Sequence, residues 1–417
     1  MRNPMESESR GEGGGSGRPL RIMVCPHELV TGGSQINAID LAGRLKRRGH
    51  EVEIYARPGE LNARIAEAGI AFVPAPGRGG RRVAPPGRAG LAREIRRFRP
   101  DIVHCYEAPP TVASAAVAAT LPHHSLTTVM SMHVPDYIPE DIPLFVGTAE
   151  LAAGQSHRSG PVHLMEPPID TDADAPGDTA GARRELGIDE QQFVVAVVGR
   201  LSLEHEKAAG VCEAIEMLAR RDLERPVTLI VAGSGDREAE VVAAARRAEG
   251  HPGLTIRLEG NVPDPRVIYR AADVVFGMGG SALRAMSHAK PLIVQGREGF
   301  WRVLTPETVD QFLQQGFFGA GPSGGPDIAT AILDLEHDAA LRGRLGSYGR
   351  ALVLDRFSLE GATSMLEAAY AVELTRDVSF SARRRSLVQS YLRYGKFRLA
   401  IAAPWLQRAF RRLSGRR

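Results

Sequence analysis

The segment LRIMVCPHELVTGGSQINAIDLAGRLKRRGHEVEIYA, residues 20–56, contains a complete strand–helix–strand unit. It opens with an apolar run that predicts a buried strand, and it continues with a loop that ends at Gly33. From Ser34, the expected N-cap, apolar residues recur at helical spacing until Gly49 ends the helix. VEIYA, residues 52–56, then predicts the next strand. Such a unit is typical of a parallel sheet whose strands are connected by helices.

The same alternation continues along the chain in two series. In the first, strands and helices are expected at residues 70–73, 91–98, 102–105, 112–119 and 126–133. The second series follows an acidic stretch, and its strands are expected at residues 193–198, 227–232, 256–259, 274–276 and 292–295. Strands that are apolar throughout belong in parallel sheets covered on both faces. The sequence therefore predicts an α/β chain of two doubly wound, Rossmann-like domains that face each other across a cleft.

Composition divides the chain further. The predicted segments are a disordered leader (1–18), an N-terminal α/β domain (19–175), a C-terminal α/β domain (176–355), a closing helix that returns to the first domain (356–376) and a basic amphipathic tail (377–417). The leader is rich in Gly, Ser and Glu and has no apolar stretch, so it does not resemble a signal peptide.

Charge is distributed unevenly. The net charge is +3, but residues 378–417 contain eleven Lys/Arg and no acidic residue, so the rest has 41 basic against 49 acidic residues. An acidic body argues against nucleic-acid binding. Three widely spaced cysteines do not suggest a zinc site or a disulfide framework, and no apolar run is long enough to span a membrane. A cytoplasmic location is expected, with the tail as a candidate contact to an anionic inner membrane face.

Three segments carry the glycines and cations of a candidate ligand site. They are TGGSQ at residues 31–35, VVGRLSLEHEKAAG at 197–210 and AADVVFGMGGSALRAMSHAKPLIV at 271–294. Glycine turns before helix N-termini leave backbone N–H groups free for phosphate. Together with PDIVHCYE (100–107), SMH (131–133) and PPIDTDADAP (167–176), they resemble glycosyltransferase family 4, whose members have the GT-B fold, over residues 20–375.

The resemblance implies a reaction and its residues. It implies transfer of a sugar from a nucleotide-diphosphate sugar to an acceptor with retention of configuration, with no metal ion and no cofactor besides the donor. Gly32 and Gly33 would lie against the donor, and Arg200 and Lys207 would bind its pyrophosphate. Lys207 stands farther from Arg200 than in the family pattern. His133 would position the donor sugar. Plain turns, solvated cations and a strand-end histidine are the alternatives at these positions.

The third motif departs from the family. Gly277, Gly279, Gly280 and Ser281 form a loop that leads into a helix, where backbone amides would bind the donor. The family has one glutamate just before this loop and another eight positions later. This chain has Phe276 and, in the second position, an arginine.

Three explanations of that departure remain open. Arg284 would contact a phosphate while Glu298 replaces a lost acceptor, or backbone amides alone would grip the donor, or the protein would bind without transferring. Persistence of the glycines and of Arg200 and Lys207 favours an active enzyme with an altered donor site. A sugar-nucleotide epimerase and a non-catalytic relative that binds a nucleotide or a partner transferase are the alternative functions.

Several other patterns in the sequence allow more than one interpretation. Residues 170–172 (DTD) have metal-site spacing but fall in the interdomain segment, and residues 233–235 (GSG) lack the last glycine of a dinucleotide fingerprint. Glu107 is a candidate base only for an inverting enzyme. Residues 404–417 can form a helix with apolar and arginine faces, which fits an anionic bilayer or packing on the body equally. The acceptor stays open among lipid-linked, envelope-glycan and small-molecule aglycone classes.

Overall fold

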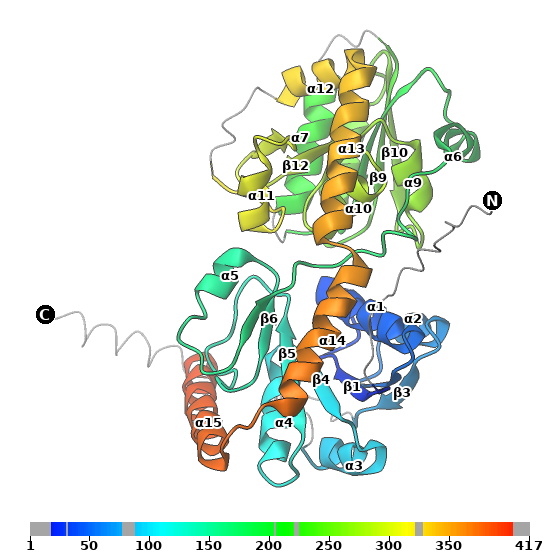
Figure 1. The fold of residues 1–417 in the computed structure, drawn as a ribbon. Helices are drawn as coiled ribbons and strands as arrows, with labels where there is room; N and C mark the ends of the chain where they lie inside the picture. The colour runs from blue at the N-terminus through cyan, green and yellow to red at the C-terminus, as the bar shows by residue number, and fades with distance from the viewer. Residues whose placement is uncertain are drawn as a thin grey trace, which may run out of the picture.

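The computed structural model describes residues 18–30, 32–76, 88–203, 206–220, 225–321 and 328–402, with the side chains of 400–402 excepted. These residues form two α/β domains, which Figure 1 shows one above the other. The predicted leader and residues 403–417 of the predicted tail lie outside the described residues. Among the described helices, none is both long and apolar enough to cross a bilayer.

The first domain contains a parallel sheet with the strand order β3-β2-β1-β4-β5-β6-β7. Its strands are β1 (Arg21–Cys25), β2 (Glu51–Ala56), β3 (Ala71–Pro74), β4 (Ile102–Tyr106), β5 (His124–Val129), β6 (Leu144–Val146) and β7 (Val162–Leu164). Its helices are α1 (Gly33–Arg47), α2 (Asn62–Glu67), α3 (Arg88–Phe98), α4 (Ala108–Ala118) and α5 (Ala149–Ala153).

Both faces of this sheet are covered. Apolar side chains of β1, β2 and β4 pack with those of α1 and α14 (Leu359–Thr375) on one face. On the other face, Met23, Cys25 and Val103 pack with Leu91 and Ile95 of α3. Because the strands are buried on both sides, they are apolar at almost every position rather than at every second one.

The second domain contains a sheet with the order β10-β9-β8-β11-β12-β13, in which β13 alone runs antiparallel to its neighbour. Its strands are β8 (Phe193–Val198), β9 (Val227–Ala232), β10 (Leu254–Gly260), β11 (Val274–Gly277), β12 (Leu292–Gln295) and β13 (Trp301–Val303). Its helices are α6 (Thr179–Leu186), α7 (Lys207–Ala219), α8 (Glu238–Arg247), α9 (Arg266–Ala271), α10 (Gly280–Ser287), α11 (Val309–Gln315), α12 (Ile328–His337) and α13 (Ala339–Arg356). Two doubly wound parallel-sheet domains confirm the predicted fold class.

The chain passes between the two domains twice, and the two connecting segments are hydrogen-bonded to each other. Helix α14 (Leu359–Thr375) continues from α13 into the first domain, where Leu366 and Tyr370 are buried (Figure 1). The interdomain segment that leaves the first domain is bound to the start of α14, because Ile169 N–H donates to Phe357 O at 2.7 Å and Leu359 N–H donates to Ile169 O at 2.9 Å. Helix α15 (Phe380–Ala402) then packs on the first domain beside α4.

Five details of the sequence prediction were wrong. Strands β6, β7 and β13 were missed because three residues each are too few for a recognisable apolar run. Strand β5 ends at Val129 rather than at residue 133, because the next two N–H groups donate to the Glu107 carboxylate instead of to a strand. The N-cap of α1 is Gly32, not Ser34.

Candidate functional site

The two sheets each have one point where strand order reverses, and the predicted site residues follow the strands at these points. In the first sheet the reversal lies between β1 and β4, and Gly33 and Glu107 follow these strands. In the second it lies between β8 and β11, which are followed by Arg200 and by Gly279. Ligands of open α/β sheets bind beyond the carboxyl ends of the strands at such a reversal.

Gly32 and Gly33 form the start of α1. A Cβ on Gly32 would lie 2.5 Å from Gln35 Oε1, whereas a Cβ on Gly33 would meet no described atom within 4 Å. The first intrahelical bond runs from Ile36 N–H to Gly32 O at 3.0 Å. The N–H groups before Ile36 therefore stand at an open edge, where a helix N-terminus attracts negative charge.

Arg200 is exposed in the loop after β8, and this loop is held by close backbone packing. Leu201 N–H donates to Ser234 O at 3.0 Å. A Cβ on Gly233 would lie 1.8 Å from the carbonyl oxygen of Gly199, and one on Gly235 would lie 2.2 Å from that of Leu201. The glycines of residues 233–235 thus let the β9 loop lie against the loop that carries Arg200, which explains them without a dinucleotide.

Lys207 is the first residue of α7, and the buried Gln295 at the end of β12 fixes this helix start. Gln295 Nε2 donates to Glu206 O at 3.2 Å and to Lys207 O at 3.3 Å. Glu298 lies in the adjacent exposed loop, and its N–H donates to Glu206 Oε2 at 2.8 Å. A Cβ on Gly210 would come within 1.8 Å of Gln295 Nε2, so α7 needs glycine there. The predicted residues Lys207 and Glu298 therefore belong to one connected edge.

The third motif forms the turn between β11 and α10. Gly277 and Gly279 are buried, and Gly280 is exposed as the first residue of α10. Gly279 has φ 53° and ψ −127°, which L residues rarely adopt. The Ser281 hydroxyl is used within the turn, because it donates to Met278 O at 3.0 Å. The exposed part of this motif is thus the N–H end of α10 around Gly280.

Neither residue at the family's glutamate positions offers an acceptor group. Phe276 is fully buried, and its ring packs edge-on against Trp301 with the centroids 5.2 Å apart. Arg284 Nε lies 3.3 Å from Asp174 Oδ2 in the interdomain segment. A Cβ on Gly280 would lie 3.7 Å from Arg284 Nη1, so the guanidinium stands beside the exposed start of α10.

Charge across the domain boundary is concentrated near Arg284. Burial raises the pKa of Asp174, and Arg284 partly offsets this. Burial likewise raises the pKa of Asp40 on α1 in the first domain, against the lowering effects of Arg64 and Arg284. The positive charge of Arg284 on α10 therefore acts on carboxylates of both the interdomain segment and α1.

His133 lies on an exposed bend beyond β5 rather than at the end of a strand. The nearby His104 has a different role. It is buried, with Nδ1 2.6 Å from the Tyr370 hydroxyl and Nε2 2.7 Å from Thr128 Oγ1. Burial lowers the pKa of His104 to about 3, so it is neutral and ties α14 to β4.

The two aspartates of the Asp-x-Asp pattern, Asp170 and Asp172, lie close to a positively charged side chain of α1. Arg44 of α1 lies 3.6 Å from Asp170 Oδ1 and 3.4 Å from Asp172 Oδ2. Asp170 Oδ1 also accepts from the N–H groups of Asp172 and Ala173, both at 3.2 Å. These aspartates join α1 to the interdomain segment.

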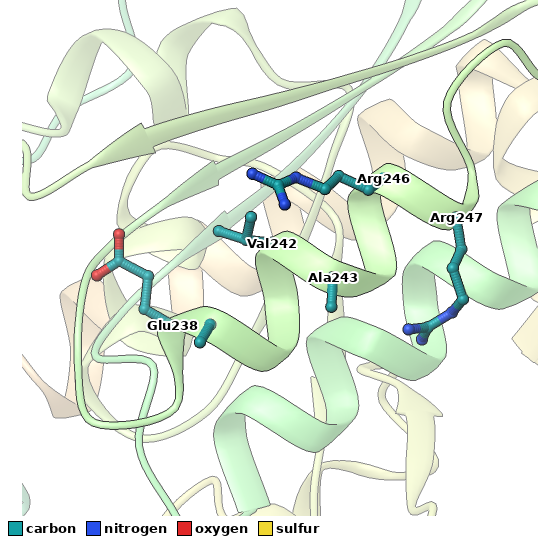
Figure 2. A pocket seen from close by; sticks show the side chains of 6 residues that line it. Glu238, Val242, Ala243, Arg246 and Arg247 are labelled. Atoms are coloured by element: carbon teal, nitrogen blue, oxygen red, sulfur yellow. The ribbon is translucent and has the colours of Figure 1, made fainter.

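Two hollows lie elsewhere in the second domain, and neither is lined by a predicted site residue. Figure 2 shows the first, a surface depression along α8 that includes Val242, Ala243 and Arg246. Arg247, at its edge, donates to Glu216 of α7 at 3.1 Å. The second is an apolar cavity of about 350 Å³ between β13, α12 and α13. Both lie apart from the strand ends that hold the cations.

Two functional features were beyond sequence reasoning. Glu107, considered only as a base, has its carboxylate bonded to the loops after β1 and β5. Glu206, which was not singled out, bonds the Glu298 loop to the start of α7. Both have a positive φ, at 68° and 55°, and no side-chain pattern reveals this conformation.

Comparison with protein families gives two matches that together span both domains. The model of Glycosyltransferase Family 4 matches residues 31–168. The model of glycosyl transferases group 1 matches residues 192–338. Each match covers most of one domain and includes the candidate site residues of that domain.

Curated relatives are similar over part of their length. The D-inositol 3-phosphate glycosyltransferase of Mycobacterium sp. (strain KMS) is 34% identical over 206 residues, 45% of this chain and 43% of the relative. That of Kribbella flavida is 28% identical over 212 residues, 47% of this chain and 48% of the relative. That of Mycobacterium marinum is 29% identical over 327 residues, 73% of this chain and 64% of the relative. The chain thus spans about half the length of the first two.

Solved structures share the arrangement of both domains. A glycosyltransferase from Rickettsia africae superposes with a TM-score of 0.67 at 16% identity, covering 86% of this chain and 100% of that one. HepE of Anabaena, solved in complex with UDP, gives a TM-score of 0.65 at 15% identity, covering 85% and 100%. At such identities the likeness shows a common fold.

Proposed function

The chain belongs to glycosyltransferase family 4 and has the GT-B fold, and from this premise we propose that it transfers a sugar from a nucleotide-diphosphate sugar to an acceptor with retention of configuration. One observation carries the proposal. The strand ends of the second domain bring Arg200, Lys207 and Arg284 to the edge where the uncapped start of α10 is exposed. Positive side chains and helix N–H groups together suit a pyrophosphate.

Each domain contributes different residues to the proposed reaction. As the bond between the sugar and the diphosphate breaks, negative charge develops on the departing nucleotide, and Arg200 and Lys207 stabilise it. The acceptor oxygen bonds to the anomeric carbon, and its proton passes to the departing phosphate. His133, exposed on the first domain, contacts the sugar by hydrogen bonding. These side chains would perform the charge stabilisation without a metal ion, and Asp170 and Asp172 remain engaged by Arg44.

Donor binding is tested first. Thermal shifts with UDP, GDP, ADP and their sugars identify the nucleotide, and the UDP bound to HepE makes UDP the first choice. Arg200→Ala and Lys207→Ala should each weaken it at least tenfold, because a charge-assisted hydrogen bond contributes about 1.5–3 kcal/mol. Arg220→Ala, an exposed cation at the far end of α7, serves as control. Equal affinities in all three variants would refute the assignment.

Transfer is tested by release of the nucleoside diphosphate in the presence of an acceptor. Because the relatives are named for D-inositol 3-phosphate, a phosphorylated polyol is the first acceptor to supply. A product with the donor's anomeric configuration, formed in excess EDTA, is the expected result. Inverted configuration or dependence on a divalent cation would contradict the mechanism.

A second candidate follows from the buried Phe276 and the paired Arg284. Because both family glutamates are absent, the protein would bind a nucleotide sugar but would not transfer the sugar to an acceptor. Tight nucleotide binding with no release of diphosphate from any donor would favour this non-catalytic role.

We also propose that α15 places the enzyme on an anionic membrane surface. One face of α15 is bound to the first domain, where Ser390 donates to Tyr137 O and Arg393 to Glu140. The opposite face exposes Val388, Leu392 and Leu399, at 50%, 63% and 59%. This apolar stripe is flanked by exposed basic residues, Arg384, Arg385 and Lys396. Such a face suits the boundary between anionic headgroups and acyl chains, and places a lipid-linked acceptor within reach.

Sedimentation with phosphatidylglycerol-containing vesicles tests the membrane contact. Leu392→Asp should release the protein into the supernatant at low salt. Val372→Asp changes a similarly exposed residue (60%) on α14 and should leave binding unchanged. Binding that survives both Leu392→Asp and deletion of residues 378–417 would exclude the tail.

A further inference from the structure

Glu107 combines an unusual backbone conformation with a buried carboxylate. It directly follows β4 and is the N-cap of α4, with φ 68° and ψ 175°. This conformation is essentially restricted to glycine, and other residues retain it only where the surrounding structure imposes it. Glu107 is nevertheless a glutamate, with 7% of its surface exposed. A strained, buried, charged residue at a sheet reversal calls for a reason other than the local fold.

The carboxylate joins two loops that are distant in sequence. Oε1 accepts from Ser34 Oγ at 3.1 Å, from Met130 N–H at 3.0 Å and from Ser131 N–H at 3.3 Å. Oε2 accepts from Ser131 Oγ at 2.9 Å. Among the described residues its carboxylate has no ion-pair partner, so these donors and the N-terminus of α4 carry the compensation of its charge.

Both loops lie beyond the carboxyl ends of strands of the first domain, where the candidate site residues Gly33 and His133 are. Ser34 is the second residue of α1 and follows Gly33, whose surroundings are open. Ser131 precedes His133 by two residues on the bend beyond β5. As a general base, Glu107 would accept a proton on a carboxylate that already accepts four hydrogen bonds, and such bonds favour the charged form over the protonated one.

We propose that Glu107 is a positioning residue that holds the start of α1 and the His133 bend in a fixed relation across the sheet reversal. The strained backbone is retained because it directs one carboxylate at both loops. This inference rests on the proposed sugar transfer, in which the same two loops contact the donor sugar.

Hydrogen exchange of the full chain tests the connection itself. Glu107→Ala should speed exchange of the Met130 and Ser131 amides at least tenfold, because they lose their acceptor. Glu107→Gln keeps an oxygen acceptor and should restore most of the protection. Glu94→Gln is the matched control: Glu94 is a 6% exposed carboxylate on α3 that binds Arg93 and Arg97 instead. Unchanged exchange in Glu107→Ala would overturn the inference.

Kinetics separate positioning from general stability. Glu107→Gly accepts the backbone conformation without strain but removes the carboxylate, so it should melt at or above Glu107→Ala. Both should lower kcat at least tenfold, and both should bind the nucleoside diphosphate within threefold of the wild type, because that ligand lies on the second domain. Glu107→Gln should recover activity, and Glu94→Gln should not lose it.

The outcomes are distinguishable. Faster exchange in Glu107→Ala with undiminished kcat would refute the positioning role while leaving the proposed function intact. A wild-type protein that turns over no donor would refute the proposed function and any role of Glu107 in it, while exchange still decides whether the carboxylate holds the loops.

Discussion

Replacing Gly279 by alanine should damage the second domain, whereas the same change at the next residue should not. Gly279 has φ 53° and ψ −127°, and an L residue in such a conformation costs about 1–3 kcal/mol. A Cβ there would also lie 2.7 Å from Phe318 Cζ, but this half-buried ring tip can turn away. Alanine restricts the unfolded chain, which returns about 0.4–1 kcal/mol. The expected net loss is about 1–2 kcal/mol.

Gly280 is the matched control. It is the first residue of α10, and a Cβ there would meet only Arg284 Nη1 at 3.7 Å, an ordinary contact. Alanine is favoured over glycine inside helices by up to about 1 kcal/mol. The two variants should therefore differ by about 2 kcal/mol in unfolding free energy.

Urea unfolding followed by tryptophan fluorescence measures this difference. The chain has two tryptophans, and in a Trp405→Phe background Trp301 reports the second domain alone. Equal unfolding midpoints for the two variants would show that α10 does not start as described. Gly280→Ala should also weaken nucleotide binding about tenfold without any loss of stability, because on the proposed function its methyl group would stand where the phosphate binds. Unchanged affinity would show that no phosphate of the nucleotide binds at the start of α10.

Two further predictions concern buried side chains. Burial lowers the pKa of His104 from its usual 6.5 to about 3, so the unfolded chain binds a proton that the folded chain does not between these values. The stability that neutral His104 contributes is therefore fully present above pH 6.5, and the free energy of unfolding should fall by about 1.4 kcal/mol per pH unit below it. Urea titrations at pH 7 and 5 measure this loss, which should be smaller in His104→Gln than in the wild type. Phe276→Glu, which restores a family glutamate, should unfold the second domain because Phe276 is fully buried against Trp301; a folded variant by circular dichroism would contradict this.

The fold was predictable because its strands and turns are strongly marked. Strands β1 and β8 are buried at all but one position each, so their apolar runs located them within a residue. The three-residue strands lack such a signal, since their pairing is decided by neighbours already in the sheet. The end of β5 was misplaced because Met130 and Ser131 bond to a carboxylate rather than to a strand.

The sequence indicated which candidate residues follow the strand ends, but not the contacts that these residues make. The strands of a parallel sheet end at one edge, so the residues that follow β1 and β4 had to gather at the edge of the first sheet, and those that follow β8 and β11 at the edge of the second. The partners of each side chain depend on contacts between distant segments. Arg284 meets Asp174 from the interdomain segment, and Gln295 of β12 holds the start of α7 at Lys207. Sequence spacing contains no information about either contact.

The missing glutamates are consistent with the shape of the turn. Only Met278 and Gly279 separate β11 from α10, so the family's first acidic position falls inside the strand. There Phe276 pairs with Ile293 and Val197 of the neighbouring strands, and its side chain must enter the core. A carboxylate at this position could not reach a donor. With Arg284 turned to Asp174, this edge offers backbone N–H groups and positive charge, which suit a diphosphate, and Glu298 in the loop beside Lys207 is the remaining predicted acceptor. On the proposed function, the first-domain loops of Gly33 and His133, which Glu107 joins, would then share in the selection among sugars.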